Sequence, residues 1–392
     1  MVSPAKVLLY LFEFLNCYSA VYYSNFLFFY LHRTFGFSEA QNLMTAALGG
    51  FVYIIAARQG GKLAQRYGCM KFLYLGCFVM AVSLTAGLLF SSPPAQIIVY
   101  CLWTAGVCLV WPALEAMISE RAGASLPKMI GIYNVTWACG GAVAYFTAGI
   151  LIENLGMASL FWLPLGITVA EAAILPLASR YLKQENLLQN HEKIQHAPVS
   201  PASAKRFLLM AWIANPFSYV AINTVIPLIP SIAENLGLST GQAGILCSLW
   251  MFARLAAFIL FWQWTGWHYR FRWLAGSFLL MIACFFGFLT AGTIRVLLTA
   301  QLGFGLSIGL IYYSSLYYSM NVEENQGANA GLHEAMIGAG LFAGPAIGAA
   351  ALYLVPVAAG MGAWSVGGLL CLGFSGMLFV YRSRKKSSSR FF

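Results

Sequence analysis

A few ionisable side chains lie inside long apolar stretches of this sequence. They are Glu13, Glu115, Glu171, Arg254, His333 and Glu334. If these stretches cross a membrane, a charge at the bilayer centre costs about 2.5–3.5 kcal/mol on insertion scales, so each residue is a candidate for function. A carboxyl group in apolar surroundings can bind and release a proton near neutral pH, and an imidazole titrates there unaided. These residue types therefore suit proton transfer, ion pairing or the binding of an anion.

The apolar stretches that hold these residues have the length of membrane spans. The chain has 392 residues, of which 60% are hydrophobic and 9% are charged, whereas soluble proteins carry about 25% charged residues. About twelve apolar runs of about 20 residues, each enough to cross a bilayer, are centred near residues 18, 48, 82, 106, 140, 168, 217, 250, 282, 306, 340 and 368. The alternating strands of a membrane β-barrel do not occur in the sequence. The sequence therefore predicts an all-α integral membrane protein with twelve transmembrane helices.

Basic residues are concentrated on one side of the predicted membrane. The net charge is +10, and of 22 Lys and Arg all but Arg33, Arg254 and Arg295 fall on that side. The positive-inside rule assigns it to the cytoplasm and places both termini there. The expected location is a cell membrane, either an inner or a plasma membrane, with the lipid bilayer as a partner. No nucleic-acid recognition motif accompanies the charge, so no nucleic-acid partner is expected.

The chain divides at a long polar segment near its middle. Residues 183–206 hold mixed charges, two prolines and two histidines, which predicts a cytoplasmic linker. The linker separates an N-terminal bundle of six helices, residues 1–182, from a C-terminal bundle, residues 207–382. Residues 383–392 form a basic cytoplasmic tail.

Two short matches indicate that the halves are repeats of one unit. The letters GFSEAQ at 36–41 match GLSTGQ at 237–242, and GIYN at 131–134 matches GLHE at 331–334 at nearly the same offset. Each member of the first match predicts a capping box, in which a serine and a glutamine satisfy free amides at a helix start. Duplication of a six-helix unit explains both matches and gives the two bundles a pseudo-symmetric relation.

The segment GGKLAQRYGCMK, residues 60–71, resembles the loop signature of the major facilitator superfamily. Gly61, Arg66 and Gly68 match the signature, while Gln65 replaces its usual aspartate. The resemblance implies two six-helix bundles, a central cavity lined by spans 1, 4, 7 and 10, and transport by alternating access. It also implies a protein that is usually monomeric.

The resemblance gives some of these residues expected roles in the gate or in coupling. The gate candidates are Gly61, Arg66, Gly68, Glu115 and Arg121. The candidates for proton coupling are Glu13, Glu334 and His333, and proton or another ion is the expected coupling partner. Alternatives remain open: Glu13 can serve as a structural partner of an arginine, and Glu334 can close a gate by a salt bridge to Arg66 or Arg58. Arg254 can pair with Glu13 or Glu334, or it can bind an anionic substrate.

Polar and aromatic side chains share faces of the predicted spans and are candidates for the wall of a substrate cavity. They are Asn16, Tyr23, Trp111, Asn134, Trp137, Asn215, Tyr219, Asn223, Trp250, Arg254, Tyr312 and Tyr313. Amide and phenol groups beside aromatic rings suit a hydroxylated or ring-bearing small molecule. Packing between helices and interfacial belts are the alternative role of the aromatic residues.

Motifs for enzymatic chemistry or bound cofactors are missing from the sequence. The nine cysteines form no C-x-x-C pair, HEAMI at 333–337 lacks the second histidine of a zinc motif, and no phosphate-binding G-x-x-x-x-G-K-[ST] loop occurs. We therefore expect no metal, no cofactor and no enzyme. The prediction is a secondary active transporter, proton-coupled, for a small sugar-like or organic-acid solute. The alternatives are a proton-driven exporter of amphipathic compounds and a transporter-like solute sensor.

Overall fold

The computed structural model describes residues 3–119, 126–188, 201–321, 326–355 and 361–383. The helices of the first half are α1 (Pro4–Phe35), α2 (Glu39–Tyr67), α3 (Cys69–Leu89), α4 (Pro93–Ser119), α5 (Leu126–Leu155) and α6 (Ser159–Leu188). Those of the second half are α7 (Pro201–Asn235), α8 (Thr240–Cys247), α9 (Leu249–Gln263), α10 (Phe271–Leu289), α11 (Ile294–Asn321), α12 (Gln326–Leu354) and α13 (Met361–Ser383). Helices α8 and α9 form one membrane-length segment that is interrupted at Ser248.

The all-helical membrane architecture predicted from the sequence is confirmed. Within the described ranges, 11 helical segments are long and apolar enough to cross a membrane. Helix α1 is the remaining segment, and its 32 residues also exceed the length of about 20 residues that a span needs. It is more polar than the others because it carries Glu13, Asn16 and several tyrosines. Both Glu13 and Asn16 are 1% exposed, so these groups face protein rather than lipid.

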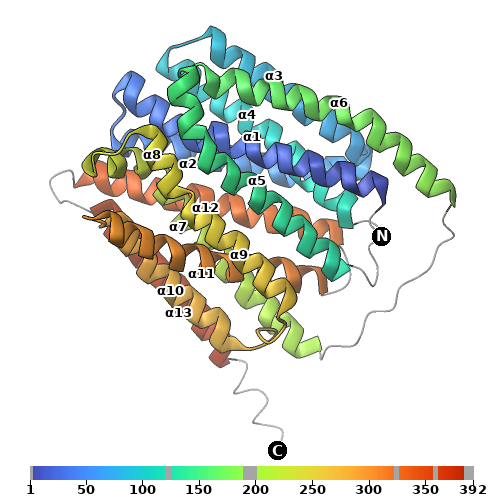
Figure 1. The fold of residues 1–392 in the computed structure, drawn as a ribbon. Coiled ribbons are helices and arrows are strands. Elements are labelled where there is room, and N and C mark those ends of the chain that lie inside the picture. Colours follow the sequence, from blue (N-terminus) through green and yellow to red (C-terminus); the bar gives the residue numbers. More distant parts are fainter. Residues whose placement is uncertain (1–2, 120–125, 189–200, 322–325, 356–360, 384–392) are drawn as a thin grey trace, which may run out of the picture.

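The two halves lie side by side, the first coloured blue to green and the second yellow to red (Figure 1). Across the interface, α2 packs against α12, and α5 packs against α8 and α9. By the internal repeat, α2 corresponds to α8–α9, and α5 corresponds to α12. The two contacts between the halves are therefore related by the same pseudo-symmetry that relates the bundles.

The capping boxes expected at equivalent helix starts are confirmed. At the start of α2, Gln41 N donates to Ser38 Oγ over 3.3 Å, and Ser38 N donates to Gln41 Oε1 over 2.8 Å. At the start of α8, the same pair of bonds joins Ser239 and Gln242 over 3.2 and 3.0 Å. The same capping arrangement is therefore present at equivalent positions in both halves.

Glycines allow the two halves to touch backbone to backbone. A Cβ atom added to Gly149 of α5 would lie 2.9 Å from the carbonyl carbon of Thr240. A Cβ atom added to Gly50 of α2 would lie 2.6 Å from the carbonyl oxygen of Leu341 in α12, and one on Gly338 would lie 2.9 Å from a backbone atom of α2. Small residues permit such close approach of membrane helices. We call these two contacts, α2 with α12 and α5 with α8, the glycine seams.

Polar contacts also join the halves at the end of the molecule opposite the two termini. His32 Nε2 lies 3.0 Å from Glu234 Oε2, which links the end of α1 to the end of α7. Gly241 N at the start of α8 donates to Glu153 Oε1 near the end of α5 over 2.8 Å. These contacts hold the halves together at that end.

The predicted domain boundaries fall partly on helices. Helix α6 continues to Leu188 and α7 begins at Pro201, so both ends of the expected 183–206 linker are helical. Residues 189–200 lie outside the described part of the chain, as do residues 384–392 of the expected basic tail.

Candidate functional site

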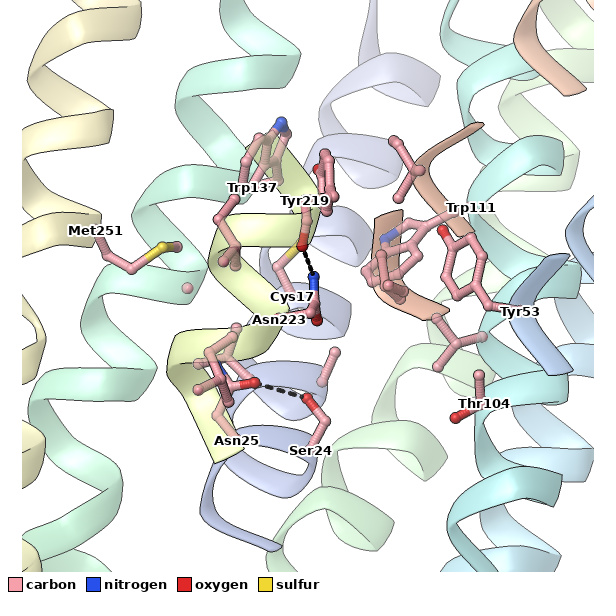
Figure 2. A pocket seen from close by; sticks show the side chains of 18 of the residues that line it. Cys17, Ser24, Asn25, Tyr53, Thr104, Trp111, Trp137, Tyr219, Asn223 and Met251 are labelled. Carbon is pink, nitrogen blue, oxygen red and sulfur yellow. Dashed lines mark hydrogen bonds between the residues drawn. The ribbon is translucent and has the colours of Figure 1, made fainter. Parts of the chain in front are cut away.

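A central cavity of about 190 Å³ lies between the two halves. Its wall comes from α1, α2, α4 and α5 of the first half and from α7, α9, α11 and α12 of the second. Figure 2 shows part of this wall, with Trp111 and Trp137 from the first half and Tyr219 and Asn223 from the second. A cavity shared by two bundles is the arrangement that a rocking motion can open to either side in turn.

Three carboxyl groups face this cavity: those of Glu13, Glu115 and Glu334. They are 1%, 5% and 3% exposed, respectively. Each accepts one hydrogen bond, from Cys17 Sγ (3.3 Å) to Glu13, from Tyr133 Oη (3.3 Å) to Glu115, and from Tyr53 Oη to Glu334. Glu13 and Glu115 lie in the first half and Glu334 in the second, so both halves contribute an acid.

No described Lys or Arg side chain lies within 4 Å of these three carboxyl groups. The ion pair found in the described ranges joins His32 and Glu234 at the far end. The second oxygens of Glu13 and Glu115 have no hydrogen-bond partner. An ionised carboxylate without a compensating cation is costly in apolar surroundings, so each of these groups is a candidate to carry a proton.

Arg254 of α9 is surrounded by aromatic rings. Its Cζ atom lies 4.5 Å from the ring centroid of Trp137, 5.1 Å from Tyr312, 5.6 Å from Phe258 and 5.9 Å from Tyr219. Rings at such distances attract a cation through their negative faces and do so without cancelling its charge. The side chain is 3% exposed and lines the cavity.

This environment differs from the ion pair considered for Arg254 on sequence grounds. No described carboxylate lies within 4 Å of its guanidinium, and Nε and Nη2 have no hydrogen-bond partner. Glu13 and Glu334 bind other side chains instead. The positive charge therefore faces the cavity unpaired.

The structure brings most of the expected cavity residues together. Those that line the cavity are Trp111, Trp137, Tyr219, Asn223, Trp250, Arg254 and Tyr312. Tyr23 instead packs inside the first half, with its ring centroid 4.8 Å from that of Trp103. Asn134 accepts a hydrogen bond from Trp137 Nε1 over 3.2 Å and lies behind the wall.

The other expected residues lie outside the cavity wall. Asn16 and Asn215 are each 1% exposed and buried between helices. Tyr313 packs against Trp267, with ring centroids 5.7 Å apart. His333 lies behind Tyr312, where its Nδ1 is 3.2 Å from Ser315 Oγ.

The expected gate residues are dispersed. Gly61 is buried in α2, Gly68 joins α2 to α3 with a φ of 104°, and Glu115 lies in the cavity. Arg66 is exposed, with its Cζ atom 5.3 Å from the ring centroid of Tyr67. Arg121 lies outside the described residues.

The salt bridge considered between Glu334 and Arg66 or Arg58 is corrected by the structure. The partner of Glu334 is Tyr53 near the middle of α2, and no ion pair joins it to a described arginine. Arg66 follows Tyr53 by more than three turns of α2, which is about 20 Å along the axis at 1.5 Å per residue. Glu334 therefore contributes to the cavity rather than to the loop after α2.

Tyr53 and Tyr133 are site residues that reasoning from the sequence missed. Each donates a hydrogen bond to a cavity carboxyl group. For Tyr133 a signal existed, because the internal repeat aligns it with His333. For Tyr53, which stands among apolar residues of α2, the sequence offers no comparable signal.

A family model described as Major Facilitator Superfamily matches residues 9–345. The chain belongs to the major facilitator superfamily. No curated protein matches the sequence. Among solved structures, the chain is similar to nucleoside transporter NupG, with 13% identity over 97% of this chain and 99% of that one and a TM-score of 0.68. It is also similar to the human organic anion transporter MFSD10 (TETRAN), with 13% identity over 97% and 100% of the two chains and a TM-score of 0.67.

Membership of the superfamily makes the chain a multi-pass membrane transporter of a small molecule and not an enzyme. The cavity agrees with what the resemblance implied for a major facilitator protein. Helices α1, α4, α7 and α11, which are spans 1, 4, 7 and 10, all contribute to its wall. The two similar structures share the fold at low sequence identity, and their substrates are properties of those proteins.

Proposed function

We propose that the protein is a proton-coupled secondary active transporter for a small sugar-like or organic-acid solute. It acts as a monomer in a cell membrane, with both termini in the cytoplasm. The observation that carries this proposal is the set of cavity carboxyl groups, Glu13, Glu115 and Glu334, which have no described cation within 4 Å. A transporter that binds its solute and its proton in one cavity can make the binding of each depend on the other.

Glu13 and Glu334 are the proposed coupling residues because they lie on opposite halves of the transporter. A rocking motion of the halves changes the surroundings of both groups, and it can thereby change how tightly each holds a proton. His333 is a further proton candidate behind the wall, since its Nδ1 contacts Ser315 and its Nε2 has no partner.

The contacts between the halves support alternating access. With both termini in the cytoplasm, the end held by His32 and Glu234 faces outward. The structure then represents a state that is closed toward the outside. Opening of that end requires the glycine seam between α5 and α8 to separate.

The cavity wall supports a small organic solute. Amide and phenol groups of Asn223, Tyr219 and Tyr312 share the cavity wall with the rings of Trp111 and Trp137. Polar groups placed among rings fix the orientation of a ligand while the rings bury its apolar part. The solved structures with this fold include carriers named for nucleosides and for organic anions, which are small organic molecules as well.

Proteoliposomes test the proposal by separating two kinds of flux. Solutes that raise the unfolding temperature of the purified protein are first selected from sugars and organic acids. Their uptake is then measured with an imposed pH gradient and, separately, by exchange without a gradient. We expect Glu13→Gln and Glu334→Gln to lose gradient-driven accumulation and to retain exchange, because exchange needs no net proton movement.

The matched control is Glu39→Gln, which makes the same chemical change at an exposed position. It should accumulate solute like the unaltered protein. Gradient-driven accumulation that survives in both cavity variants contradicts proton coupling through these residues. If solute-driven proton flux is found only with amphipathic compounds, and only when these compounds move outward, the chain is an exporter instead.

A further inference from the structure

Arg254 lines the cavity, and its guanidinium has hydrogen-bond donors without a partner. Its Nε and Nη2 atoms are buried and have no hydrogen-bond partner. These two nitrogens form one side of the planar guanidinium group. Two parallel N–H groups on one side match the two oxygens of a carboxylate, which is the bidentate geometry that makes such pairs strong.

The rings around Arg254 hold the cation in place while leaving that edge unsatisfied. Trp137 comes from the first half of the chain, whereas Tyr219, Phe258 and Tyr312 come from the second. Each ring centroid lies between 4.5 and 5.9 Å from Cζ. Cation–π contacts offset part of the cost of burying the charge, but they provide no acceptor for the Nε and Nη2 hydrogens.

The charge of the wall limits the charge of the ligand. Arg254 is the only Lys or Arg among the described residues that line the cavity, and it shares this wall with the carboxyl groups of Glu13, Glu115 and Glu334. One negative charge on a ligand neutralises the arginine. A second negative charge would lie buried beside the acids without a cation, which is strongly unfavourable.

The aromatic side chains of the wall favour a ligand with a flat ring. Trp111, Trp137, Tyr219 and Tyr312 all line the cavity. Aromatic rings pack best against other flat rings in offset or edge-to-face arrangements. A saturated or purely hydroxylated solute would not make these ring-to-ring contacts.

From these observations we infer that the substrate is a singly charged carboxylate on a flat ring, bound through the Nε and Nη2 edge of Arg254. The inference rests on the proposed function, since it names the substrate class of the same cavity. It selects the organic acid over the sugar among the solutes proposed above. The proton carried on the cavity acids would then accompany an anion, so that the pair crosses without net charge.

Benzoate is the probe that tests this inference, because it is the simplest molecule of this class. Binding is measured by thermal unfolding of the purified, full-length protein in detergent at about neutral pH, where carboxylic acids are ionised. Benzamide keeps the flat ring without the charge, phthalate adds a second charge, and glucose has neither a flat ring nor a charge. We expect saturable stabilisation by benzoate and little by the other three molecules.

Variants then assign the binding to the arginine. Arg254→Gln should weaken benzoate binding by about tenfold to a hundredfold, because each hydrogen bond to a charged group is strong. Arg254→Lys keeps the charge but loses the edge, so it should bind benzoate with intermediate affinity. Arg295→Gln is the matched control at an exposed position on α11 and should bind like the unaltered protein.

Several results would overturn the inference. They are equal stabilisation by benzamide, preference for phthalate or glucose, absence of benzoate binding, and unchanged benzoate affinity in Arg254→Gln. If Arg254→Gln does not fold, the comparison of the four probes on the unaltered protein still decides. Because the assay measures binding alone, benzoate binding without gradient-driven uptake would refute proton coupling and leave this inference intact. Proton-driven uptake of another solute without benzoate binding would refute this inference and leave proton coupling intact.

Discussion

Replacing Gly149 by alanine should shift the transporter toward the state that is open at the end opposite the termini. In the structure, an added Cβ atom at this position would lie 2.9 Å from both the carbonyl carbon of Thr240 and the Cα atom of Gly241. Carbon atoms pack at about 3.5–4.0 Å. The clash is with backbone rather than with a flexible side chain, so α5 and α8 must move apart by roughly 1 Å to relieve it.

The size of the effect follows from the cost of overpacking. Forcing extra atoms into a close contact costs about 1–3 kcal/mol, and this cost falls only on the state in which the seam is closed. The ratio of open to closed molecules should therefore rise by about 5-fold to 150-fold. Alanine also favours a helix over glycine by up to about 1 kcal/mol in any state, and the control must share this gain.

Gly276→Ala provides that control. Gly276 lies in α10, and an added Cβ atom there would meet nothing within 4 Å. Both variants therefore receive the same helical gain, and only Gly149→Ala strains the seam.

Thiol labelling reports the shift. In a cysteine-free background, Asn25→Cys places a thiol in the cavity wall on α1 (Figure 2). A membrane-impermeant maleimide is added to the outer face of sealed vesicles, and the labelling rate is measured. The rate should rise in the Gly149→Ala background and stay unchanged in the Gly276→Ala background. Equal rates in both backgrounds, with both proteins folded, would refute the role assigned to the seam.

Three further predictions concern single residues. Tyr53→Phe removes the hydrogen-bond donor to Glu334, a bond worth about 1–3 kcal/mol. This variant should accumulate less solute under a pH gradient while exchange persists, and unchanged accumulation would argue against the contact. Gly68 has a φ of 104°, so Gly68→Ala should lower the unfolding free energy by about 1–3 kcal/mol, and an unaltered melting temperature would contradict this strain. Burial lowers the pKa of His268, in the loop after α9, to about 4. An imidazole in the unfolded chain has a pKa of about 6.5, so the unfolded state binds the proton first and stability should fall as the pH drops from about 6.5 to about 4. Because the side chain is only partly buried, the loss of stability should be about 1 kcal/mol or less. His268→Gln should flatten the acidic side of a plot of melting temperature against pH. Parallel curves for the variant and the unaltered protein would exclude this role of His268.

The fold could be predicted from the sequence because its signals are local. Each span is an apolar run of the length that a bilayer demands. The capping boxes at Ser38 and Ser239 depend on side chains three residues apart, so they form wherever that spacing meets a helix start. These local signals do not depend on how the neighbouring helices pack.

The candidate site could be predicted only in part because it depends on how each helix is rotated. Tyr23 is predicted to line the cavity, but it turns toward Trp103, whereas Glu13 of the same helix lines the cavity. The bond between Tyr53 and Glu334 joins residues of different halves, and spacing along one helix contains no information about its partner. The sequence predicts that Arg254 lies deep in a span, but three of the four rings that surround it, those of Trp137, Tyr219 and Tyr312, come from other helices.

The glycine seams have a consequence for how far this sequence can diverge. Where Gly50 meets α12 and Gly149 meets α8, backbone touches backbone, so the distance between the halves does not depend on the identity of larger side chains. Other positions face lipid, such as Leu372 and Phe379 of α13, which are 69% and 72% exposed. Any apolar residue is compatible with contact to lipid at such positions. We expect a saturation mutagenesis library to tolerate wide replacement on such lipid-facing surfaces and almost none at the two seam glycines. Strict requirements at a few positions and loose ones at most others would allow a fold to persist at 13% identity.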